Sequence, residues 1–130
     1  MSESDSVAHV AAAQRTVADP ANPGVVREQA FAMEGLWAGI ALTQPGMDSG
    51  WHHHGEYESV VFVLSGALRM ESGPGGLSIV DAKAGDFLYV PAGAIHREQN
   101  TGDRESEVVV MRAGHGSATV NVHGPASIPD

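Results

Sequence analysis

Glycine and proline recur at short intervals through this chain, and that spacing constrains its fold more than any other feature. The sequence holds 16 glycines and 7 prolines in 130 residues. They separate one short apolar segment from the next, a pattern typical of many short strands joined by turns. The chain is therefore expected to fold as an all-β sandwich or barrel.

Eight segments have the length and apolar character of strands, which is the number that a double-sheet jelly roll requires. They are residues 25–33, 36–43, 60–70, 77–80, 87–90, 94–99, 107–112 and 118–122. The unbroken apolar run at 60–64 predicts a strand near the centre of the fold, covered on both faces. The glycine and proline cluster at 73–76 predicts a hairpin after it. Residues 7–17 are compatible with one or two turns of helix.

The length of the chain fits a single domain with one core. Both ends lack an apolar pattern, since 2–6 is small and acidic and 124–130 contains two prolines. We expect a flexible N-terminal segment at 1–20, a folded domain at 21–123 and a flexible tail at 124–130.

The charge balance excludes several classes of partner. Sixteen acidic residues against seven basic ones give a formal net charge of −9, so no basic face is available for nucleic acid. No apolar run approaches the roughly 18 residues that span a bilayer, and we expect a cytoplasmic protein that does not bind membranes. Because the chain has no cysteine, any metal must be bound by nitrogen and oxygen.

Three adjacent histidines give the first chemical signal. His52 and His54 are two positions apart, so on an extended segment their imidazoles project from the same face, while His53 points the other way. Such a pair can share one metal ion. The signal is weak by itself, because neighbouring histidines also occur in solvated loops.

A second segment combines turn residues with a further histidine. Gly85 begins a short strand that Pro91 ends, Gly93 supplies turn geometry, and His96 opens the returning strand ahead of Asn100. The alternative interpretation is an ordinary proline-glycine hairpin with a surface histidine.

Together the two segments resemble the paired motifs of the cupin superfamily. The second motif is matched at Gly85, Pro91, Gly93, His96 and Asn100, and the first at Gly46, His52, His54 and Gly66. The resemblance covers about residues 25–122 and extends to a group of small, uncharacterised bacterial cupins. It implies a double-stranded β-helix, or jelly-roll barrel, that holds one divalent metal ion.

The resemblance also implies the ligands: His52, His54 and His96, with a glutamate from the first motif. Counting forward from the histidines places that glutamate at Glu58, whereas counting back from Gly66 places the role on Ser59. Because side chains alternate along a strand, these two residues are expected on opposite faces of it unless a bulge interrupts the alternation. We expect Glu58, since a carboxylate is the better ligand. Glu56 is a weaker candidate, and a three-histidine site completed by water is the alternative.

Such a sphere leaves coordination positions open, which is typical of a catalytic metal. It suits iron, manganese, nickel, copper or zinc. The expected function is a metal-dependent enzyme for a small-molecule substrate, with a dioxygenase favoured because the family often pairs this sphere with oxygen chemistry. The alternatives are a redox-neutral isomerase, decarboxylase or polyketide cyclase, and a non-catalytic ligand-binding cupin.

A few other residues have weaker claims to a role. Trp37 and Trp51 are candidates for pocket walls, although core packing is the usual role of an aromatic residue. Arg69 and Arg97 are candidates for anion binding, with solvated charge as the alternative. The resemblance to small cupins also predicts a homodimer, because the strand at 25–33 would otherwise leave an exposed edge.

Overall fold

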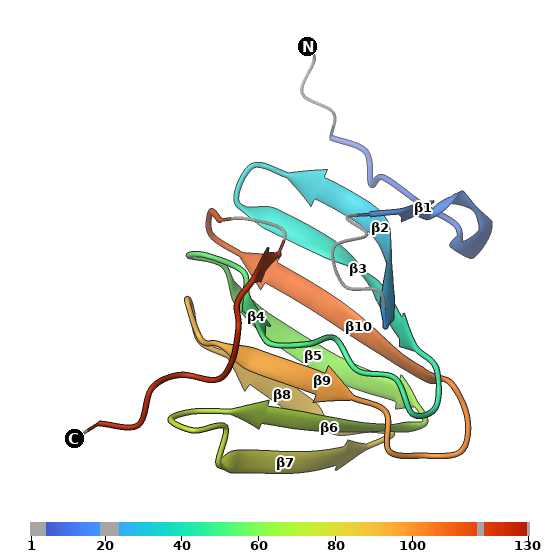
Figure 1. Cartoon of the computed structure of the whole chain (residues 1–130). Helices are drawn as coiled ribbons and strands as arrows, with labels where there is room; N and C mark the ends of the chain where they lie inside the picture. Colours follow the sequence, from blue (N-terminus) through green and yellow to red (C-terminus); the bar gives the residue numbers. More distant parts are fainter. Residues whose placement is uncertain (1–4, 19–23, 117–118, 130) are drawn as a thin grey trace.

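The computed structural model describes residues 5–18, 24–116 and 119–129, and these form two sheets of antiparallel strands (Figure 1). The first sheet has the order β1-β2-β3-β10-β5-β8 and the second the order β11-β4-β9-β6-β7. The elements are η1 (Ala12–Gln14), β1 (Thr16–Val17), β2 (Val25–Met33), β3 (Leu36–Thr43), β4 (His52–His53), β5 (Glu58–Ser65), β6 (Ala67–Ser72), β7 (Ser78–Lys83), β8 (Phe87–Val90), β9 (His96–Gln99), β10 (Ser106–Ala113) and β11 (Val120–Asn121).

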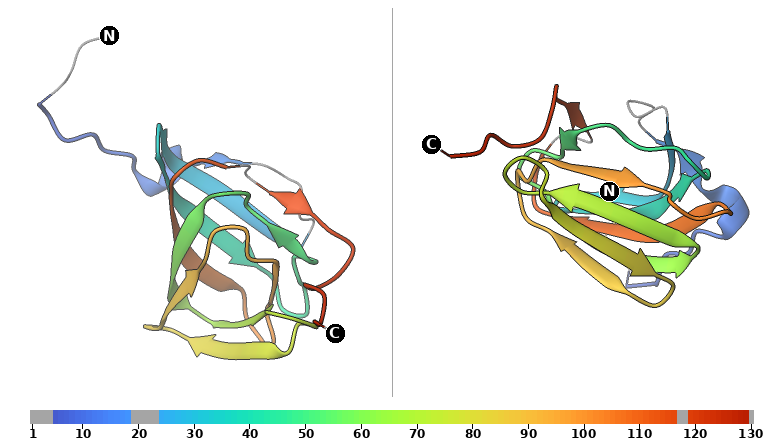
Figure 2. Two further views of the ribbon diagram at one scale, coloured as in Figure 1. Left: turned by 90° about the vertical axis from the view of Figure 1, so that its left-hand side faces the viewer. Right: turned by 60° about the horizontal axis from the view of Figure 1, so that its bottom comes forward.

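The two sheets face each other and enclose the core (Figure 2). The strands β5 and β10 bury alternate residues, as the period of two requires. In β10, for example, Ser106, Val108, Val110 and Arg112 are buried. The core contains Val25, Trp37, Ala41, Val61, Val63, Leu68, Met70, Ala82, Val90, Val108 and Val110. The predicted all-β jelly roll is therefore confirmed.

The apolar run in β5 is buried on one face only, which corrects the prediction. Val61 and Val63 face the core, but Val60 and Leu64 are 36% and 45% exposed on the outer face. The strand also lies between β10 and the terminal strand β8 rather than at the centre of its sheet. An unbroken apolar run is ambiguous because periodicity cannot tell a strand buried on both faces from one with an apolar outer face.

Gly66 divides the single strand expected at 60–70 into two strands that belong to different sheets. Its φ is +79°, which a residue with a side chain rarely adopts. A Cβ there would lie 2.9 Å from the Glu105 carbonyl oxygen and from Ser106 Cα. The chain thus passes at Gly66 from β5 in the first sheet to β6 in the second. Glycine is the one residue type that fits there without a clash.

Several local predictions can be compared directly with the structure. The bounds expected for β2, β3 and β8 are confirmed, and the 73–76 hairpin joins β6 to β7. The two-residue strands β1 and β4 were not expected, and segment 7–17 forms only the short 3-10 helix η1 before β1. The first residue of the strand expected at 118–122 lies outside the described residues. Within the rest of that segment, the structure has the two-residue strand β11.

The chain ends pack against the domain within the parts that the structure describes. β1 pairs with Glu28 and Gln29 of β2, and Ala126 forms a bridge with Pro74. Residues 1–4, 19–20 and 130 of the segments expected to be flexible lie outside the described residues. No helix in the described ranges is long and apolar enough to cross a membrane.

Candidate metal centre

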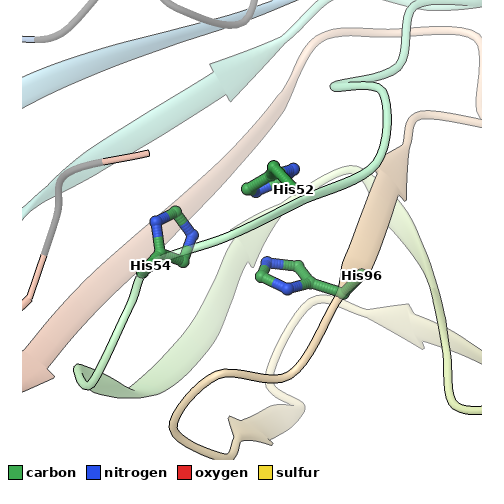
Figure 3. A group of neighbouring side chains, drawn as sticks. All are labelled: His52, His54 and His96. Atoms are coloured by element: carbon green, nitrogen blue, oxygen red, sulfur yellow. The ribbon is translucent and has the colours of Figure 1, made fainter. Parts of the chain in front are cut away.

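The three predicted histidine ligands come together inside the fold (Figure 3). His52 on β4 is the cross-strand partner of His96 on β9, and His54 follows β4 directly. All three are buried, and their ring centroids are 4.3 to 5.2 Å apart. One potential ligand atom from each lies within 4.8 Å of the others. The cluster can therefore hold a metal ion.

Backbone carbonyls orient two of these rings. His52 Nδ1 lies 3.0 Å from the Gly50 carbonyl oxygen, and His96 Nδ1 lies 2.9 Å from the Ala94 carbonyl oxygen. A carbonyl only accepts hydrogen bonds, so Nδ1 of each neutral ring carries the proton and donates it. Nε2 of both rings then keeps its lone pair, which is the state that a metal ligand needs.

A carboxylate that the sequence did not reveal lies beside two of the three histidines. Glu98 lies on β9 two residues after His96, is buried, and points into the same space. Its Oε1 is 3.1 Å from His52 Nε2 and 3.7 Å from His96 Nε2, and Arg27 Nη2 lies 3.6 Å from the same oxygen. Burial raises the pKa of Glu98, but His52, when its Nε2 carries a proton, and the Arg27 charge hold the pKa well below its usual value. The group is therefore an anion at neutral pH.

Burial acts in the opposite direction on His96. It lowers the pKa of His96 to about 4, although the Glu98 charge opposes the shift. The imidazole is consequently neutral at neutral pH and able to bind a metal.

The donor atoms fit a bound cation. His52 Nε2 makes no hydrogen bond of normal geometry within the described part of the chain, although Glu98 Oε1 is only 3.1 Å away. Two electron-pair donors at this distance repel each other unless a proton or a metal ion lies between them. Metal bonds of about 2.1 Å meeting at a right angle place their donor atoms about 3 Å apart, and wider angles separate them further. The separations of 3.1 and 3.7 Å agree with one shared ion.

Glu58, the expected fourth ligand, lies elsewhere. It is exposed at the start of β5, where it accepts a hydrogen bond of 2.9 Å from the Tyr89 hydroxyl. This bond raises the pKa of Tyr89. Strand alternation turns Ser59 inward and Glu58 outward, so the structure does not bring Glu58 to the histidines. Glu56 is also exposed.

The interior beside the cluster contains a cavity of about 20 Å³. Its lining includes Arg27, Ser59 and Arg112 as well as His54, His96 and Glu98, and the apolar residues Val61, Met70, Val90 and Val110. The strand pattern carried a signal for the arginines: Arg27 has the parity of the buried Val25, and Arg112 that of Val108 and Val110. The signal for Glu98 was its position two residues after a ligand on the same strand.

The other candidate residues lie outside this cavity. Trp37 is buried behind Arg112, and Trp51 packs near Gly76, with Arg97 stacked 4.7 Å from its ring. Arg69 pairs with Asp81 and Arg97 with Glu71. Asn100 has a supporting role: its amide nitrogen donates to the carbonyls of Thr43 and Arg104.

Known structures share this architecture. An uncharacterised protein from Klebsiella pneumoniae with a double-stranded β-helix domain is 21% identical and superposes with a TM-score of 0.68, over 81% of this chain and 90% of its own. Bacillus subtilis oxalate decarboxylase is 22% identical, with a TM-score of 0.67, over 76% of this chain but 28% of its own. The cupin domain of Schizosaccharomyces pombe Cnp3 is 14% identical, with a TM-score of 0.66, over 77% and 69%.

Comparisons of the sequence itself identify the family. A comparison with curated proteins gives no match. The family model for the cupin domain matches residues 39–112, which is more than half of the chain and includes all three clustered histidines. The protein therefore belongs to the cupin family.

Proposed function

We propose that this protein is a mononuclear metal-dependent enzyme that acts on a small organic molecule. Three buried imidazoles offer ligand atoms within 4.8 Å of one another, a buried carboxylate lies 3.1 and 3.7 Å from Nε2 of two of these rings, and this observation carries the proposal. His52, His54, His96 and Glu98 are the proposed ligands of one divalent ion, with iron, manganese, nickel, copper and zinc as candidates. Four protein ligands leave positions open for a six-coordinate ion.

The residues of the chain prepare this centre before any metal binds. The carbonyls of Gly50 and Ala94 fix two rings with Nε2 directed inward, and the low pKa of His96 keeps that ring neutral. Glu98 supplies one negative charge, and Arg27 Nη2 lies 3.6 Å from its Oε1. The bound ion supplies Lewis acidity and, for a redox-active metal, the capacity to react with oxygen.

A dioxygenase is our first candidate for the reaction. The nitrogen-rich donor set suits iron, copper and nickel, which take part in oxygen chemistry. Four apolar side chains wall the cavity, Val61, Met70, Val90 and Val110, and they limit the access of water to a reactive centre. A dioxygenase transfers both atoms of O₂ to its substrate and needs no separate reductant.

A redox-neutral decarboxylase is the second candidate. It is favoured by the two arginines that line the cavity, because guanidinium groups bind carboxylates. The similarly folded oxalate decarboxylase of B. subtilis contains Mn(II) centres. An isomerase or a polyketide cyclase would use the same Lewis-acid chemistry.

The metal centre is tested by metal content and affinity. The purified protein is expected to bind about one divalent ion per chain, and alanine substitution of His52, His54 or His96 is expected to abolish binding. His53→Ala is the matched control, because His53 belongs to the same triplet but lies outside the cluster. Full metal occupancy in all three ligand variants would refute the centre.

The reaction is tested by gas exchange in the metal-loaded protein. Oxygen uptake with enolizable diketones, catechols or other small acids supports the dioxygenase. Carbon dioxide release without oxygen uptake supports the decarboxylase. Ligand binding with neither change indicates a binding protein without turnover.

A further inference from the structure

Two arginines are buried next to the proposed metal ligands. Arg27 on β2 and Arg112 on β10 are each 3% exposed, and both line the cavity that contains His54, His96 and Glu98. This lining therefore has two guanidinium groups and one carboxylate, and a divalent ion adds further positive charge. Burying like charges is costly unless an anion accompanies them. The charge of the cavity favours an anionic ligand.

The two arginines have different surroundings. Arg27 Nη2 lies 3.6 Å from Glu98 Oε1, so Arg27 serves as the charge partner of a proposed metal ligand. Arg112 stacks on Trp37, with its guanidinium carbon 4.5 Å from the ring centroid. The indole nitrogen of Trp37 in turn donates a hydrogen bond of 2.9 Å to Gln29 Oε1. This stacking fixes the plane of a guanidinium at the cavity wall.

Ser59 adds a hydrogen-bond donor at the same place. It is the direct cross-strand partner of Arg112, and both side chains face inward. Its Oγ is buried and has no hydrogen-bond partner within the described residues. A buried hydroxyl without a partner costs free energy, so a ligand that accepts its proton would gain from it. The guanidinium and the hydroxyl together suit a carboxylate, which accepts several hydrogen bonds.

We infer that the substrate of this site is a short-chain organic carboxylate, held by Arg112 and Ser59 next to the metal ligands. The inference rests on the proposed function, because it names the substrate class of the same centre. The cavity of about 20 Å³ has room for about one water molecule, so side chains of the lining must move to admit even the smallest acid, and larger acids are disfavoured. Counted back from Gly66, the position that the cupin motif gives to a glutamate is Ser59 in this chain. Glu98 supplies the carboxylate from β9, and the space at Ser59 remains for the substrate.

Calorimetric titration of the Mn²⁺-loaded protein tests the inference without measuring turnover. Oxalate, malonate and acetate are the probes, and oxamide, malonamide and acetamide are their uncharged counterparts. We expect the acids to bind at least about tenfold more tightly than the amides. Arg112→Met retains an apolar stem against Trp37 and is expected to weaken acid binding about 10- to 100-fold, while Mn²⁺ affinity stays unchanged. Ser59→Ala is expected to weaken acid binding severalfold.

Controls separate this inference from the proposed function. Arg69→Met removes an arginine outside the cavity and is expected to leave acid binding unchanged. If the wild-type protein binds no metal, the proposed function fails first. If it binds Mn²⁺ but does not prefer acids to amides, or if Arg112→Met binds acids normally, the inference is wrong and the metal centre stands.

A further variant covers loss of folding in Arg112→Met. Arg112→Lys keeps the charge and the stem but loses the two-pronged donor geometry. It is expected to weaken acid binding about tenfold, and normal affinity in this variant would overturn the role of Arg112.

Discussion

At the scale of single residues, the proposed centre depends on which glutamate faces the histidines. Glu98→Gln keeps the size of the side chain but removes its charge, so we expect metal affinity to fall by about tenfold or more. Glu58→Gln is the matched control, since Glu58 is exposed and bonded to Tyr89. Competition with a chelator measures both affinities. A larger loss in Glu58→Gln than in Glu98→Gln would return the ligand role to Glu58.

The histidines could be predicted from the sequence because their motif fixes them by short-range spacing. The carboxylate could not, because the motif has a one-residue disagreement between Glu58 and Ser59. Alternation along β5 decides which of the two faces inward, and it selects the serine. The carboxylate proposed instead, Glu98, lies on another strand, and its approach to His52 depends on the pairing of β4 with β9.

At the scale of elements, Gly66 controls the passage of the chain from one sheet to the other. Gly66→Ala adds a Cβ at positive φ and against the backbone of Glu105 and Ser106, so we expect a loss of about 2 kcal/mol or more in the free energy of unfolding. Gly35→Ala is the control, since its φ is also +79° but no atom lies within 4 Å of the added Cβ. It should cost about 1 kcal/mol. Denaturant titration measures both, and equal losses would show that the close approach has no effect.

The strands differ in how well their sequences predict them. β2, β3 and β8 were predicted with the observed bounds, because glycine or proline lies close to both ends of each segment. β1 and β4 contain two residues each and bury too little to produce a pattern. Their pairing is decided by neighbours distant in sequence: β4 lies between β9 and β11.

At the scale of the whole molecule, the outer face of the first sheet is notably apolar. Met111, Val60 and Tyr89 are cross-strand neighbours on it, and all three are exposed. The predicted homodimer remains a prediction, and this apolar face is a candidate interface for it beside the edge of β2, which β1 partly covers. Light scattering at micromolar concentration is expected to give twice the monomer mass, and Val60→Lys to give the monomer. A monomeric wild-type protein would exclude the homodimer.

The buried His96 links the stability of the whole metal-free protein to pH. Its pKa is about 4 in the folded state, chiefly because of burial, against 6.5 for an ordinary histidine. Glu98 opposes this shift, while His52 and Arg27 add to it. Below pH 6.5 the unfolded chain gains a proton that the folded chain does not, so stability is full above pH 6.5 and falls as the pH drops toward 4. The loss over this window is about 3 kcal/mol.

The measurement is the free energy of unfolding of the metal-free protein between pH 7 and pH 5. Glu98 and Glu71 also link stability to pH, because their pKa values are lowered in the folded protein. Their stabilising contribution is lost only below the ordinary glutamate pKa, so the range from pH 7 to pH 5 lies above it. His96→Gln should flatten the decline, since the side chain no longer titrates. His9→Gln, which changes an exposed histidine, should leave the decline as it is in the wild-type protein. An equally steep decline in His96→Gln would mean that another group, and not the burial of this ligand, makes the fold sensitive to acid.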